Sequence, residues 1–88
     1  MYIVVVSKLR DIEINNEIAY VGENMEDAIE RGIESARFYV RKNYMLSSGK
    51  IFMEEDFRKE FALGIPVRLT HDLGGNCKRY VTFQLCKK

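Results

Sequence analysis

Residues 2–6 read Tyr-Ile-Val-Val-Val, and this short run decides how the rest of the chain is interpreted. β-Branched and aromatic residues favour extended strands, and the run has no alternation of apolar and polar side chains. Strands with this pattern are usually covered on both faces. The run therefore predicts a strand that is central in its sheet, with a packed layer on either side of it.

Two short apolar segments follow, at residues 12–14 and 18–21, on either side of the pair Asn15-Asn16. Asparagine tolerates the left-handed backbone conformations that a two-residue hairpin turn requires. We therefore expect either one partly solvated strand that is bent at the asparagines or two short strands.

A long helix is predicted from about Met25 to Lys42. Asn24 suits the N-cap position, because its side-chain oxygen can accept a hydrogen bond from a free amide of the first turn. Glycine inside a helix costs about 1 kcal/mol of helix propensity, so Gly32 suggests that the helix backbone lies close to a strand. The face expected to pack on the sheet carries Met25, Ala28, Ile29, Gly32, Ile33, Ala36, Tyr39 and Val40.

A second helix is predicted after a loop at residues 44–50. Met53, Phe57 and Phe61 recur every four residues, which places them on one side of a helix from Met53 to Leu63. Gly64 suits the end of this helix, and the proline two residues later prevents its continuation. Residues 51–52 are compatible with a short strand or with the approach to the helix.

The last part of the chain predicts a β-hairpin around a glycine-rich turn at residues 71–76. Its buried face should carry Ile65, Val67, Leu69, Val81, Phe83 and Leu85, and its other face Arg68, Thr70, Tyr80, Thr82 and Gln84. The predicted class is α+β, as a single domain over residues 1–88. We expect a mostly antiparallel sheet of four or five strands, with one long helix packed across a face, one short helix and a C-terminal β-hairpin.

Charge and composition limit the functions that the chain can serve. The 88 residues are 47% hydrophobic and carry a formal net charge of +1, whereas proteins that neutralise many phosphates are strongly basic. Residues 1–30 hold two basic and seven acidic side chains, a net charge of −5, and residues 64–88 hold five basic and one acidic, a net charge of +4. No segment has the pattern of a membrane span or an export signal, so a cytoplasmic location is expected.

No complete catalytic or metal-binding set is evident. His71 is the only histidine, and although Asp72 follows it, no serine lies in a nucleophile-elbow motif. Cys77 and Cys86 would lie roughly 30 Å apart on one strand, too far for a disulfide, and with His71 they supply too few zinc ligands. Residues 47–50 lack the earlier glycine and following Ser or Thr of a phosphate loop. We expect no enzyme, cofactor or metal.

Phe38 lies about 200° from the centre of the apolar stripe of the long helix. Either the second helix covers this ring, or the ring is an exposed aromatic anchor of the kind that dominates protein interfaces. Apolar residues continue into the following loop, where they usually need a covering partner. A partner-binding surface is therefore predicted at Arg37, Phe38, Arg41, Tyr44, Met45 and Leu46.

The leading hypothesis is a small non-enzymatic protein-binding module that occupies a site on a larger partner. Inhibitors and accessory proteins, including phage proteins directed against host enzymes or defence systems, are often of this kind, and a homodimer is also compatible with the sequence. The alternative is a nucleic-acid-binding or regulatory domain that uses the basic hairpin through Arg68, Lys78, Arg79 and Tyr80. This alternative ranks lower because a single aromatic ring can stack only one base.

Overall fold

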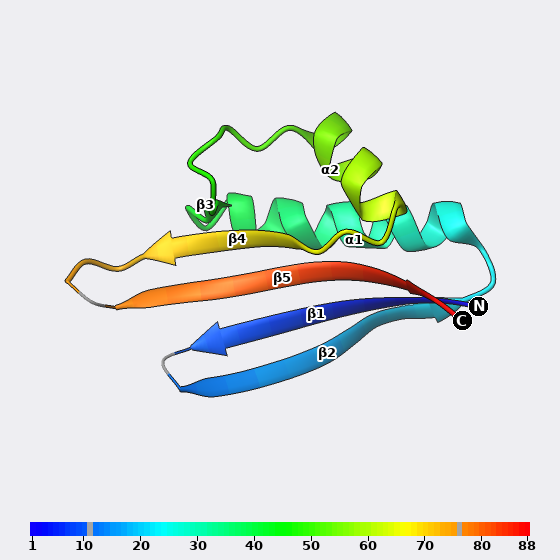
Figure 1. The fold of residues 1–88 in the computed structure, drawn as a ribbon, viewed down its shortest axis with the longest axis horizontal. Helices are drawn as coiled ribbons and strands as arrows, with labels where there is room; N and C mark the ends of the chain where they lie inside the picture. The colour runs from blue at the N-terminus through cyan, green and yellow to red at the C-terminus, as the bar shows by residue number, and fades with distance from the viewer. Residues whose placement is uncertain (11, 76) are drawn as a thin grey trace.

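The computed structural model describes residues 1–10, 12–75 and 77–88. Its elements, in chain order, are β1 (Tyr2–Arg10), β2 (Glu13–Gly22), α1 (Met25–Val40), β3 (Met45–Leu46), α2 (Glu54–Ala62), β4 (Val67–Asp72) and β5 (Lys78–Lys87). The strands form one antiparallel sheet in the order β2-β1-β5-β4-β3 (Figure 1). The α+β class and the C-terminal hairpin are as predicted.

One hydrophobic core fills the space between the sheet and the two helices. The strands contribute alternate residues to it, as expected for side chains that point to one face of a sheet. Of the six apolar residues predicted for the inner face of the hairpin, five are buried, whereas Ile65 precedes β4 and is 46% exposed. The buried set is Val4, Val6, Ala28, Ile29, Ile33, Ala36, Phe57, Phe61, Val67, Leu69, Val81, Phe83 and Leu85.

The first strand lies between β2 and β5, but only one of its faces is covered. Val4 and Val6 are buried in the core, whereas Ile3 and Val5 point to the opposite face and are only half-buried. The prediction that both faces of this strand are covered is therefore wrong. A run of β-branched residues favours an extended backbone, but it does not show that this chain supplies a second layer.

The second strand is continuous, and Asn15 and Asn16 lie inside it. The predicted turn or bend at this pair is wrong, since β1 ends at Arg10 and β2 begins at Glu13. The register with β1 shifts by one residue at Ala19, which lies opposite the Val4/Val5 step. The irregularity of this strand is therefore a bulge four residues beyond Asn15.

The helix boundaries follow the predicted signals closely. Asn24 Oδ1 accepts a hydrogen bond from the Asp27 N–H at 3.1 Å, so the N-cap of α1 is as predicted. The second helix ends before Gly64, whose φ of +80° is the left-handed conformation that favours glycine. Residues 45–46, predicted as loop, form the short edge strand β3 beside β4, and residues 51–52 belong to neither a strand nor a helix.

Gly32 faces the second helix rather than a strand, so the predicted neighbour was wrong. A Cβ atom at this position would lie 2.5 Å from Cζ of Phe61, well inside van der Waals contact. The Phe61 ring is fully buried and stacks on Phe57, with 5.1 Å between the ring centroids. The missing side chain at Gly32 therefore lets α2 set the Phe61 ring directly on the backbone of α1.

Replacing Gly32 by alanine should lower the free energy of unfolding by up to about 2 kcal/mol. Overpacking a core costs about 1 to 3 kcal/mol, and the gain in helix propensity of about 1 kcal/mol offsets part of this cost. Denaturant unfolding of Gly32→Ala, alone and together with Phe61→Leu, measures this. The alanine should be tolerated better beside the smaller leucine, and an alanine variant more stable than the wild type would contradict the packing described.

Candidate functional site

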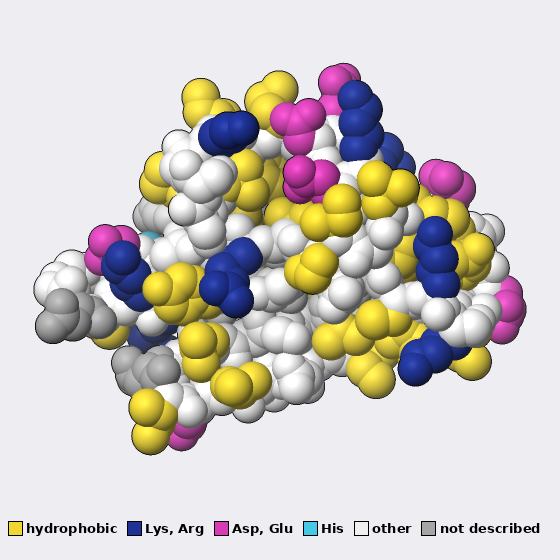
Figure 2. Space-filling view, viewed as in Figure 1, with side chains coloured by type: hydrophobic (Ala, Val, Ile, Leu, Met, Phe, Trp, Pro, Cys, Tyr) yellow, Lys and Arg dark blue, Asp and Glu magenta, His cyan; other side chains and the backbone are white. Residues whose placement is uncertain are grey.

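The sheet face opposite the helices is divided into a polar half and an apolar half. The outward positions of β4 and β5 carry Arg68, Thr70, Tyr80, Thr82 and Gln84, as predicted. Those of β1 and β2 carry six aliphatic residues on either side of the polar pair Ser7 and Asn16. We call these six the aliphatic strip: Ile3, Val5, Leu9, Ile14, Ile18 and Val21. Figure 2 shows two groups of hydrophobic side chains over β1 and β2 with polar surface between them, and mostly polar surface over the middle of β5.

The outer strand supplies the most exposed part of the aliphatic strip. Ile14 is 72% exposed and Ile18 is 65% exposed, although both belong to a regular strand. The free edge of β2 is poorly suited to pairing with a further strand, because it carries Glu13 and Glu17 and the irregularity at Ala19. The face of β2 is therefore a better binding surface than its edge.

The six residues predicted as a partner surface do not form one patch. Met45 pairs with Thr70 and is 58% exposed on the side of the aliphatic strip, whereas Leu46 pairs with Leu69 and packs against the core. Arg41 is exposed just beyond α1. The surface predicted from a continuous stretch of sequence is divided because alternate residues of β3 point to opposite faces.

Phe38, in the last turn of α1, and Tyr44, just beyond the helix, both pack against Tyr39. Phe38 is 52% exposed, so the second helix does not cover it, and its ring packs edge-on against Tyr39 with 5.3 Å between centroids. The Lys42 ammonium lies 4.8 Å from the Phe38 ring centroid. Tyr44 is half-buried between Tyr39 and His71, at centroid distances of 5.0 and 5.1 Å.

Arg37 holds the two helices together. Its Nε donates to Glu54 Oε2 at 3.0 Å, and its NH2 donates to Glu54 Oε1 at 2.5 Å. The hydrogen bond to Arg37 lowers the pKa of Glu54, and the same bond raises the pKa of Arg37. Arg58 of α2 makes a parallel contact with Glu30 of α1. Arg37 is thus engaged within the protein rather than left as a free anchor.

The residues predicted for nucleic-acid binding are also divided between the two faces. Arg68 lies over the Tyr80 ring, with 5.3 Å between the guanidinium carbon and the ring centroid. Lys78 lies on the same face of the sheet as Tyr80, because the two residues are two positions apart on β5. Arg79 points to the inner side of the sheet, past the end of α1. The outer face therefore offers one ring with one stacked guanidinium.

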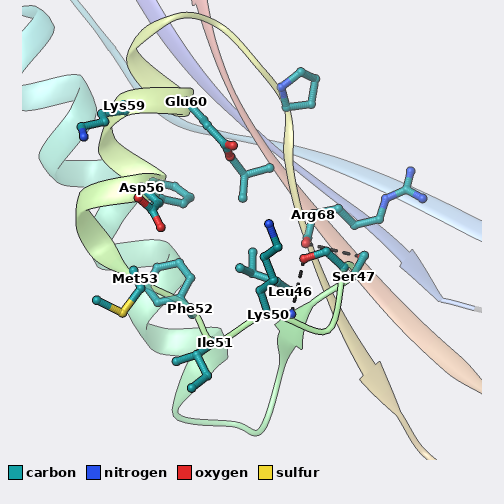
Figure 3. Close-up of a pocket in the computed structure, with 14 residues that line it drawn as sticks. Leu46, Ser47, Lys50, Ile51, Phe52, Met53, Asp56, Lys59, Glu60 and Arg68 are labelled. Carbon is teal, nitrogen blue, oxygen red and sulfur yellow. Dashed lines mark hydrogen bonds between the residues drawn. The ribbon is translucent and has the colours of Figure 1, made fainter.

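A cleft of about 620 Å³ separates α2 and the segment before it from β4. Figure 3 shows Lys50 pointing into this cleft and Glu60 directed toward it from α2, while Lys59 and Arg68 point away. The Ser47 hydroxyl is hydrogen-bonded to Thr70 at 2.6 Å, and the Gly49 N–H donates to the Leu46 carbonyl. The serine-glycine loop is therefore a closed turn, and its groups have partners within the chain.

Within residues 1–10, 12–75 and 77–88, no three His, Cys, Asp or Glu side chains come together as a metal site. Cys77 and Cys86 are both free thiols. No helix in this part of the chain has the length and the hydropathy to cross a membrane. The His71 ring lies against Tyr44.

Comparison with protein families, with curated proteins and with solved structures gives no significant match. Function is therefore inferred from the residues and their arrangement. The sequence did contain a signal for the aliphatic strip, because Ile14 and Ile18 share one side of a regular strand only if no turn separates them. The predicted turn at the asparagines concealed it.

The ion pair between Arg37 and Glu54 should make stability depend on pH. A carboxylate with a lowered folded-state pKa stabilises the fold above its ordinary pKa, and the contribution is lost as pH falls through the lowered value. The melting temperature of the wild type should therefore fall more between about pH 6 and pH 3 than that of Glu54→Gln. Arg37 stays charged throughout, since its pKa is raised.

Glu55→Gln is the matched control, because Glu55 is the neighbouring carboxylate in the first turn of α2. This variant should retain the pH dependence of the wild type. Equal loss of pH dependence in both variants would show that the acidic helix end, rather than the contact with Arg37, causes the effect.

Proposed function

We propose that the protein is a small non-enzymatic binding module that holds a larger protein on its aliphatic strip. The contrast between the two halves of one sheet face carries the proposal. An antiparallel sheet with a solvated face normally presents polar side chains there. The outward positions of β4 and β5 follow this rule, whereas those of β1 and β2 follow it only at the pair Ser7 and Asn16.

The dimensions of the strip indicate how it would be used. From Ile3 to Leu9 it runs roughly 20 Å along β1, and two strands are roughly 10 Å wide, which gives roughly 200 Å². A stable complex buries about 800 Å² on each partner. The strip would therefore form the apolar centre of an interface whose polar rim extends over Thr82 and Gln84 of β5.

Charge on the same face indicates the chemistry of the partner. Arg68 is held over the Tyr80 ring, so its guanidinium loses little freedom on binding, and arginine and tyrosine are frequent interface hot spots. Lys78 shares this side, and Asp72 is the one carboxylate among the outward positions of β4 and β5. A partner with an apolar ridge flanked by carboxylates matches this arrangement.

Binding of single-stranded nucleic acid to the outer face is the second candidate. The stacked pair of Arg68 and Tyr80 is the observation that favours it, since a base can stack on such a platform. The aliphatic strip beside the pair argues for a protein, because aliphatic side chains offer a base neither a stacking ring nor a hydrogen bond. If the protein is such a binding module, it would act as an inhibitor or accessory protein of its partner, of phage or other origin.

The double substitution Ile14→Thr and Ile18→Thr should abolish retention of the partner while leaving the fold intact. Both side chains are largely exposed, and threonine keeps a high strand propensity. Loss of a hot spot of about 2 kcal/mol weakens binding roughly 30-fold. Affinity capture from cells that make the protein, quantified by mass spectrometry for wild type and variant, measures the loss.

Ile51→Thr serves as the matched control, because Ile51 is 84% exposed but lies on the side of the cleft. The partner should be retained by this control. Retention by the double variant, or equal loss with Ile51→Thr, would exclude the aliphatic strip as the binding surface.

A further inference from the structure

The strands extend past the end of α1 and form a basic hollow on the inner side of the sheet. The 16 residues of α1 span about 24 Å, whereas the 10 residues of β5 span about 33 Å. Beyond the helix lies a pocket of about 310 Å³. Its floor carries Lys8, Arg10, His71 and Arg79, and the end of α1 adds Phe38, Tyr39 and Lys42, with Tyr44 beside them.

Three basic side chains form a row across the floor of this pocket. Arg79 of β5 pairs in register with Arg10 of β1 on one side and with His71 of β4 on the other. Like charges directly opposite one another on neighbouring strands destabilise a sheet. Glu13 is the strand partner of Arg10 on β2, but among the described residues no carboxylate lies within 4.0 Å of either arginine. An anion bound over this row would relieve the repulsion.

The other charged groups near the pocket are already engaged. Lys8 donates to Glu17 at 2.8 Å, and Lys42 lies over the Phe38 ring. The carbonyls at the end of α1 would otherwise repel an anion, but local turns occupy them. The Tyr39 carbonyl accepts from the N–H groups of Lys42 and Tyr44. Among the described residues, the charges of the hollow without an ion pair or a ring contact are therefore those of Arg10 and Arg79.

Aromatic rings form the walls of the same pocket. Phe38 is half-exposed at the end of α1, and Tyr44 and His71 lie against one another at its other side. Exposed rings beside cations suit a ligand that combines a flat aromatic group with a phosphate. A volume of about 310 Å³ is at the lower end of ligand-binding pockets and accommodates one such unit.

We propose that this pocket binds a nucleotide, with the phosphate over Arg10 and Arg79 and the base against Phe38. The site lies on the opposite face of the sheet from the aliphatic strip, so it does not depend on the proposed protein partner. It also gives a role to Phe38, which is outside the core stripe of α1. The shared chemistry allows two sources, a free nucleotide or a nucleotide within single-stranded nucleic acid.

The test is a calorimetric titration of the full chain with the four ribonucleoside monophosphates, with adenosine and inorganic phosphate as comparisons. At least one monophosphate should bind 10-fold or more tightly than adenosine or phosphate alone. Arg79→Gln and Phe38→Ala should each weaken this binding at least 10-fold. Without ligand, Arg79→Gln should raise the melting temperature, because it removes the repulsion from Arg10.

Lys78→Gln is the matched control, since it removes one charge from the adjacent residue of β5 but on the other face. This control should bind like the wild type. Tighter binding of a short single-stranded oligonucleotide, with the same dependence on Arg79, would support the site and identify nucleic acid as the source. Absence of binding to all these probes at millimolar concentration, or equal weakening by Lys78→Gln, would overturn the proposal.

Discussion

The contact between the Phe61 ring and the bare backbone at Gly32 is the constraint on which the rest of the structure depends. It brings α2 against α1, and through Phe57 the same aromatic stack reaches Phe83 of the sheet at 5.9 Å between centroids. The apolar faces of both helices therefore pack against the same side of the sheet. Within residues 1–10, 12–75 and 77–88, no further helix or strand covers the other side.

The ion pairs between the helices complement this packing at its rim. Arg37 with Glu54 and Arg58 with Glu30 connect α1 and α2 on the solvent side of the aromatic contact. Exposed ion pairs contribute little stability individually. These two ion pairs join the same two helices that the contact between Phe61 and Gly32 brings together.

Features that depend on neighbouring residues were predictable, and features that depend on tertiary contacts were not. The Asn24 cap and the alternation around Leu69 and Phe83 act within one turn or one strand, and the structure has both. The asparagine pair has turn propensity, but pairing with β1 keeps it extended. For Gly32, the sequence indicated a close approach, although only the tertiary structure identifies Phe61 as the neighbour. The predicted partner surface combined residues that β3 directs to opposite faces.

The proposed binding surface requires that the aliphatic strip is exposed to solvent in the isolated protein. Methyl NMR with a soluble paramagnetic agent measures this directly, residue by residue. In the isolated protein the methyl groups of Ile14 and Ile18 should relax strongly, while those of Val4 and Ile33 should be protected. Protection of Ile14 and Ile18 equal to that of Ile33 would contradict the account, because the aliphatic strip would then already be covered.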